Sequence, residues 1–435
     1  MSFSRRYVFM ALTAAALLSQ PTLNASAGPL PTDRPVTLEE CVSVALGEHP
    51  RLKGAEEDVN AANFRTEQAA STFWPQASIG ANRIWSHSES AARTASANTN
   101  NLNLNLSWDV FDFGRTYYTV KSSSALASAT VKDLNAAQQT VAYDVMDSYY
   151  NLLKAQSLVK VAQESLDNAN GHLKQAQAFF EVGVKPRYDV TKAEVEVNNA
   201  KVRVIAAQDA VKGARVNLNT RLAIDPLTPL IVQDRPQLEV LDKPMDGYFE
   251  EALRNRPELL GLQERLRANQ LAVKSTRAEY LPQINATGNI GLTKEDNVSG
   301  TFDSNTFAIA VDLPVFEGFR TRARVGEARA NTLSTRYKVE DAKTGVLNQV
   351  SNSYIAIEDA KARTEALNVS VRSARENLDI AQGRYEAGVG ALIDVTDAQV
   401  SLTQAETDLA QAFYDYHLAH TSLLRSTGKA PLNKL

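Results

Sequence analysis

Hydrophobic residues recur at every seventh position in two segments of the chain. A strict seven-residue period is typical of the seam along which helices pack in a coiled coil. An ordinary solvent-facing bundle helix accounts for the spacing equally well. We therefore predict one helix at the start of each half of the chain. The seam positions are Leu38, Ala45, Leu52, Val59, Thr66 and Phe73, and Met245, Ala252, Leu259, Leu266, Val273 and Tyr280.

The pattern changes to alternation after each of these helices. Pro75 and Pro282 interrupt the helical pattern, and a period of two residues predicts strands. We predict four strands, or two hairpins, over 76–85, 101–109, 284–292 and 307–313. In the second strand one face is apolar and the other polar; the apolar face holds Leu102, Leu104, Leu106 and Trp108, and the polar face Asn103, Asn105, Ser107 and Asp109.

Two long segments then lack proline, over about 113–179 and 318–384. Unbroken, each corresponds to about 100 Å of helix at 1.5 Å per residue. Each ends at a glycine-containing turn, Gly183 or Gly388, and a shorter return helix follows. The order helix, hairpin, long helix, turn and return helix therefore occurs twice.

The sequence itself is duplicated. Pro226 and Pro431 lie 205 residues apart, as do the two turn glycines, while Pro75 and Pro282 differ by 207. We predict a signal peptide over 1–27, a first repeat over 28–226, a linker over 227–246 and a second repeat over 247–435. The signal peptide is indicated by Arg5 and Arg6 before a short apolar run that ends at Ala25-Ser26-Ala27.

A hairpin with one apolar face must bury that face in lipid or in a protein core. Alternation with an aromatic residue at the strand end is typical of a water-filled membrane barrel. Four strands are too few to close a barrel, because the smallest single-chain outer-membrane barrels use about eight. Several chains must therefore share one barrel. The soluble alternative is a four-stranded sheet packed under a helix.

Charge and chemistry exclude other classes of protein. The formal net charge of −4 becomes −6 when Arg5 and Arg6 are removed with the signal peptide, and no basic stripe indicates a nucleic-acid partner. Cys41 is the single cysteine, which excludes an internal disulfide framework. No nucleophile motif, phosphate loop or metal-binding cysteine cluster indicates an enzyme, a cofactor or a resident metal. His417 and His420 could share a metal, but two polar helix residues near a channel wall are the favoured interpretation.

Taken in order, these motifs resemble the TolC family of outer-membrane efflux and secretion channels. The resemblance is carried by the segments 280–283 (YLPQ), 313–318 (LPVFEG), 385–388 (YEAG) and 394–398 (DVTDA), and it covers essentially the whole mature chain. It implies a mainly helical fold with membrane β structure. Long antiparallel coiled-coil helices would form a periplasmic α-barrel, and two hairpins per chain would contribute to a trimeric 12-stranded β-barrel.

The resemblance also implies location and partners. The chain would be a homotrimer in contact with outer-membrane lipid, and it would work with a periplasmic adaptor protein and an inner-membrane ABC or proton-driven transporter. Its function would be passive export of drugs, metals or proteins, with the cargo set by the inner-membrane partner. The alternative is a non-channel coiled-coil protein of the surface or periplasm.

Two departures from the family pattern concern the entrance and the waist. Family members often hold the entrance closed with a basic residue two positions after the second turn's glycine, and here that position is Gly390. We predict that Lys185 or Arg187 replaces it. The other predicted gate residues are Asp189, Tyr188 and Tyr385; the alternative is that these charges are simply solvated. Because the sequence ends at Leu435, any belt around the waist should be small and built mainly from residues 225–246.

Asp394 and Asp397 are predicted to form a cation-selective entrance. They lie three residues apart at the start of a return helix, so both can face one side. Three chains would place six carboxylates around one opening, and a ring of acids is a common basis for cation selectivity. Ordinary helix capping explains one of the two aspartates, but explains the pair less well.

Overall fold

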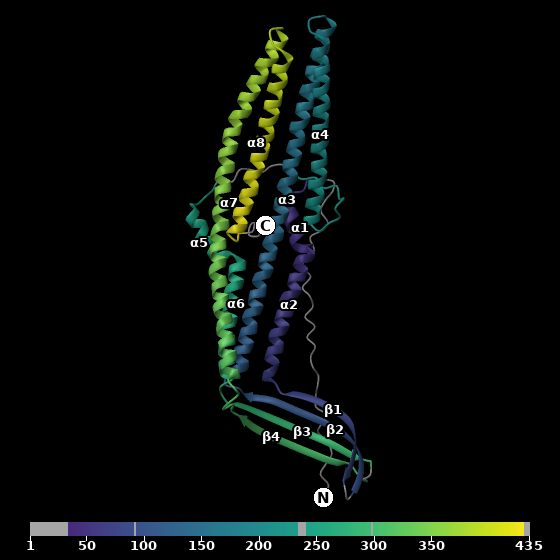
Figure 1. Ribbon diagram of the computed structural model, residues 1–435, viewed down its shortest axis with the longest axis vertical. Coiled ribbons are helices and arrows are strands. Elements are labelled where there is room, and N and C mark those ends of the chain that lie inside the picture. The colour runs from purple at the N-terminus through teal and green to yellow at the C-terminus, as the bar shows by residue number, and fades with distance from the viewer. Residues whose placement is uncertain (1–33, 91–92, 234–240, 297–298, 430–435) are drawn as a thin grey trace.

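The computed structural model describes residues 34–90, 93–233, 241–296 and 299–429. The predicted signal peptide, 1–27, lies outside these residues. The chain is strongly elongated, with a small sheet at one end and two helical turns at the other (Figure 1). Within the described segments, no helix carries an apolar stretch long enough to cross a membrane.

The expectation of one continuous helix at the start of each repeat is wrong. Each is two helices, which meet at a proline: α1 (Leu38–Glu48) and α2 (Pro50–Ala70), then α5 (Met245–Asn255) and α6 (Pro257–Ala278). A proline disfavours helical backbone in the residue before it, and His49 and Arg256 are accordingly extended. The seam survives the break, because Ala45 and Leu52 are both buried.

The four predicted strands are confirmed and are longer than the alternation indicated. They are β1 (Gln76–Ser90), β2 (Arg93–Phe111), β3 (Gln283–Glu295) and β4 (Phe302–Asp312), and they form one antiparallel sheet in sequence order. The register places Leu104 between Ile79 and Ile290. The apolar face is open in the single chain, since Ile79 is 76% exposed and Phe307 is 75% exposed.

The two predicted long helices are also confirmed. α3 (Arg115–Glu181) and α7 (Arg320–Glu386) have 67 residues each, or about 100 Å. Each turns back into a helix of 35 residues, α4 (Arg187–Arg221) or α8 (Leu392–Ser426). In Figure 1, α4 and α8 cover the halves of the long helices that are far from the sheet, while α2 and α6 lie beside the near halves.

The largest hydrophobic cluster lies at the waist, where α1 packs on α3 and the linker crosses them. Leu230 and Val232 of the linker are buried in it, and Val232 pairs with Val36 in an isolated parallel bridge. The Tyr149 hydroxyl lies 3.0 Å from the carbonyl oxygen of Val36 and 2.9 Å from that of Gln233. The described part of the linker therefore contributes to the core at this level.

Candidate functional site: the helical tips and the junction between sheet and helices

The two turns at the helical tips have the same backbone geometry. Gly183 and Gly388 adopt positive φ angles of 77° and 78°, a conformation that favours glycine. In the first turn the amides of residues 184 and 185 both donate to the carbonyl of Phe179, and in the second turn those of 389 and 390 both donate to the carbonyl of Arg384. Lys185 and Gly390 therefore occupy equivalent positions in the two turns.

Lys185 connects one turn to the other. Its Nζ donates a hydrogen bond to the carbonyl oxygen of Gly390 at 3.2 Å and lies 4.9 Å from the centre of the Tyr385 ring. The Tyr385 hydroxyl in turn donates to Oδ2 of Asp189 at 3.3 Å. Three of the five predicted gate residues thus share one network, which ties α3–α4 to α7–α8.

Tyr385 is the buried centre of this network. Its side chain is 1% exposed and packs edge-on against Phe179, with ring centres 5.6 Å apart. Burial, together with the neighbouring Asp189 carboxylate, raises the pKa of Tyr385 to about 12. The phenol is therefore a neutral hydrogen-bond donor throughout the physiological pH range.

The backbone explains why position 390 carries no side chain. A Cβ atom added at Gly390 would lie 3.0 Å from the backbone carbon of Arg384 and 3.0 Å from the backbone nitrogen of Tyr385. Such a contact is too close without a backbone shift. The turn packs tightly here, and the charge arrives instead from Lys185 on the other turn.

The other predicted entrance residues stand outside the network. Tyr188 is 70% exposed, and the exposed side chain of Arg187 makes no ion pair with any residue the structure describes. Asp394 and Asp397 are both exposed on the first turns of α8. Oδ2 of Asp394 accepts a hydrogen bond from the Ala391 amide at 3.4 Å, so this residue also acts as a cap.

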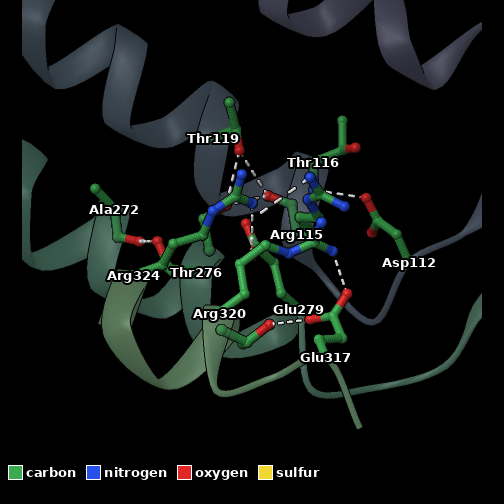
Figure 2. Close-up of polar contacts among 12 residues, drawn as sticks. Asp112, Arg115, Thr116, Thr119, Ala272, Thr276, Glu279, Glu317, Arg320 and Arg324 are labelled. Atoms are coloured by element: carbon green, nitrogen blue, oxygen red, sulfur yellow. Dashed lines mark hydrogen bonds and ion pairs between the residues drawn. The ribbon is translucent and has the colours of Figure 1, made fainter. Parts of the chain in front are cut away.

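Sequence reasoning missed a second polar cluster, where the strands pass into the long helices (Figure 2). Asp112 caps α3, because its carboxylate accepts from the amides of Gly114 at 3.1 Å and Thr116 at 2.6 Å. Glu317 holds the start of α7 and accepts from Arg320 and from the Thr321 hydroxyl. The available signal was the offset of 205 residues, which relates Asp112 to Glu317 and Thr116 to Thr321.

Glu279 joins the two long helices at this junction. It follows α6 and lies 3.8 Å from the guanidinium of Arg115 on α3 and 3.1 Å from that of Arg324 on α7. Figure 2 shows these side chains converging from three elements. Together with Glu317 and Arg320 they line a hollow of about 330 Å³. The cluster fixes the direction in which the helices leave the sheet.

Comparison with known proteins identifies the family. The family model for outer membrane efflux proteins matches residues 41–223 and 249–429. The chain belongs to the outer membrane efflux protein family. This result confirms the resemblance found from the sequence, and it places the chain in the outer membrane with a large helical periplasmic part. In the described segments no group of three or more His, Cys, Asp or Glu side chains is arranged to hold a metal.

The curated relatives include secretion and efflux proteins. The chain is 26% identical to the alkaline protease secretion protein AprF of Pseudomonas aeruginosa over 62% of this chain and 58% of AprF. It is 26% identical to the outer membrane efflux protein BepC of Brucella suis over 64% of this chain and 61% of BepC. The match to the outer membrane protein TolC of Escherichia coli covers 87% of this chain and 80% of TolC at 23% identity. The chain thus matches less than two thirds of the length of the first two.

Solved structures share the whole fold. The CusC structure superposes with a TM-score of 0.82 at 18% identity, covering 95% of this chain and 99% of CusC. The Campylobacter jejuni CmeC outer membrane channel gives a TM-score of 0.80 at 19% identity, covering 90% of this chain and 86% of CmeC. The predicted fold class, long antiparallel helices with two membrane hairpins, is confirmed.

Proposed function

We propose that this chain is the outer-membrane channel of a tripartite export system and acts as a passive conduit. Three copies complete a 12-stranded barrel, and their helices enclose a periplasmic tunnel. A periplasmic adaptor protein and an inner-membrane ABC or proton-driven transporter supply cargo at the helical tips. The names of the relatives cover both protease secretion and efflux, so the proposal includes both classes of cargo.

The sheet carries this proposal. Its apolar face is open to the outside of the chain, with Ile79, Phe307 and Ile309 between 66% and 76% exposed, and a large exposed apolar surface marks contact with protein or lipid. The opposite face carries amides, such as Asn105 and Asn289, which hydrogen-bond across β2 and β3 at 2.6 Å. Lipid outside and water inside satisfy both faces.

The proposal extends to the entrance. Lys185, Tyr385 and Asp189 form the gate that holds the tips together, with Lys185 in place of the basic residue that Gly390 does not provide. Asp394 and Asp397 from three chains form a cation-selective ring beside this gate. No chemistry is performed on the cargo. The contact between the two turns through Lys185 supports the first assignment, and the exposure of both aspartates supports the second.

The test combines oligomeric state with conductance. Native mass measurement in detergent should give a trimer, because one chain supplies four strands and the smallest single-chain barrels use about eight. The trimer should conduct ions in planar bilayers. A stable monomer would refute the barrel, and a trimer that does not conduct would instead support the coiled-coil structural protein.

A further inference from the structure

A row of polar side chains crosses the apolar face of the sheet near the outer end of β3. Strand register places Arg83 on β1, Asn100 on β2 and Lys294 on β3 side by side. The adjacent row nearer the helices holds Ala81, Leu102 and Leu292 on these three strands and ends at Asp303 on β4. Because alternate residues point to the same face of a sheet, the polar row lies on the lipid side, just beyond the apolar band.

The row carries two cations, of which one is paired. The Arg83 guanidinium pairs with Oδ2 of Asp296 at 2.8 Å and lies 5.5 Å from the centre of the Trp85 ring. The Asn100 amide donates to Oδ1 of the same aspartate at 3.3 Å. Lys294 is exposed and forms no ion pair with a residue in the described ranges. Asp303 lies on the same face one strand from Lys294, but no ion pair joins these two described side chains, so Lys294 is the unpaired cation of the row.

The position of the row defines the chemistry of its partner. It lies near the end of β3 that is far from the helices, and β1 and β2 continue for seven residue pairs beyond it. This is the depth at which we expect an apolar core to give way to head groups. Arg83 and Lys294 are separated by two strand spacings, or about 10 Å. Trp85 adds an aromatic side chain of the kind enriched at membrane interfaces. Guanidinium and ammonium groups at this depth are suited to lipid phosphate.

A neighbouring subunit does not account for the row. Lys294 stands on β3, and both edges of β3 are already paired, with β2 on one side and β4 on the other. A second copy can pair only with the free edges of β1 and β4. In the assembled barrel, the Lys294 side chain would therefore face the surrounding membrane and not a neighbouring subunit.

We propose that Arg83, Asn100 and Lys294 form a binding site for the phosphate group of an outer-leaflet lipid. The site rests on the proposed function, because it requires the apolar face to lie in the membrane. Three chains would carry three such sites around the outer rim. Asp296 accepts hydrogen bonds from both Arg83 and Asn100 and so holds these two side chains beside each other.

Native mass spectrometry of the trimer with added phosphatidic acid or phosphatidylcholine tests the site. The parent protein should retain phosphatidic acid in preference. Lys294→Gln removes the unpaired cation without disturbing the Arg83–Asp296 pair, and should reduce that preference about fivefold; the Arg83→Gln, Lys294→Gln double variant should reduce it further. The matched control is Arg336→Gln, Lys338→Gln on α7, which removes the same charge from exposed helical positions and should retain the parent's preference.

The outcomes separate this site from the channel function. Conducting Lys294→Gln trimers that retain phosphatidic acid as the parent does would overturn the lipid site and leave the conduit intact. Failure of the parent to form conducting trimers would overturn the conduit first. Equal loss in the α7 control would show a general charge effect, and displacement of the lipid by millimolar inorganic phosphate would show a free-anion site; either result would overturn the proposal.

Discussion

Lys185 of the first repeat contacts the turn of the second. Its ammonium group bonds to the Gly390 carbonyl and lies over the Tyr385 ring. Lys185→Ala removes both contacts, which together contribute about 1–2 kcal/mol to the contact between the two turns. We expect the ratio of open to closed channels to rise about tenfold, as increased conductance in planar bilayers.

Arg187 provides the matched control. It carries the same charge two residues away, but its side chain is exposed and forms no ion pair with a described residue. Arg187→Ala should conduct as the parent does. Equal effects of the two substitutions would mean that charge at the mouth matters rather than the tie between the turns, and no effect of either would remove Lys185 from the gate.

We expect His417 to make the waist sensitive to acid. The ring is 5% exposed and stacks on Tyr150 at 5.2 Å, and its Nε2 has no hydrogen-bond partner among the described residues. Burial, with a smaller contribution from His420, lowers the pKa of His417 to about 4. The folded chain therefore binds this proton less readily than the unfolded chain. Stability is full above the unfolded pKa of about 6.5 and is lost as pH falls toward 4.

Between pH 7 and pH 5 this residue should cost about 2 kcal/mol per chain. His417→Phe keeps an aromatic ring in the stack but cannot take up the proton. Thermal unfolding of the variant, followed by circular dichroism, should depend less on pH across this interval than that of the parent. Parallel pH profiles for the two proteins would show that other groups determine acid stability.

Among the elements, strand β2 has apolar and polar residues on opposite faces, and we expect a charge to be tolerated on only one of them. Leu104→Arg places a charge in the apolar band beside Ile79 and Ile290, at a cost of about 2–4 kcal/mol near the membrane midplane. Asn103→Arg places the same charge on the opposite face, where its neighbours Gly80 and Gly291 leave room for a long side chain. The first should impair trimer assembly in membranes far more than the second. Similar losses would indicate a sheet inside a soluble core.

Local patterns predicted the elements well, because each leaves a periodic trace in the sequence. Four strands, two long helices and two return helices appear where alternation, missing proline and glycine turns placed them. The break before Pro50 was missed because the seven-residue spacing continues across it. One extended residue, His49, absorbs the change in direction, and spacing alone does not reveal it.

Contacts between elements were harder to foresee. Glu279 binds Arg115 and Arg324, which lie 164 and 45 residues away along the chain, and no period connects them. The sequence predicted that either Lys185 or Arg187 would reach the second turn, but it did not indicate which, nor the contact with Tyr385. In the structure Lys185, and not Arg187, contacts the second turn, because its Nζ donates to the Gly390 carbonyl; its role in a gate stays a prediction.

Considering the whole molecule, the long helices hold the sheet far from the turns at the helical tips. The sheet lies at one end and the turn between α7 and α8 at the other (Figure 1). Asp394 and Asp397 follow that turn, at the start of α8. Between the two ends run helices of 67 residues, or about 100 Å. The tips are separated from the barrel by many times the Debye length of about 8 Å, so salt screens the barrel from the charges at the tips. If the proposed ring at the entrance sets ion selectivity, that selectivity is electrostatically independent of the barrel.

This separation leads to the prediction for the acidic ring. In planar bilayers the parent channel should prefer cations, and multivalent cations added from the periplasmic side should block it at low salt, where screening is weak. Asp394→Asn, Asp397→Asn should abolish the block and leave the trimer intact, because asparagine at position 394 still accepts the cap hydrogen bond from Ala391. The control is Glu376→Gln, Asp379→Asn, an exposed acidic pair with the same spacing on α7, in which the block should persist. Block that survives in the Asp394, Asp397 variant would place the cation site elsewhere on the channel.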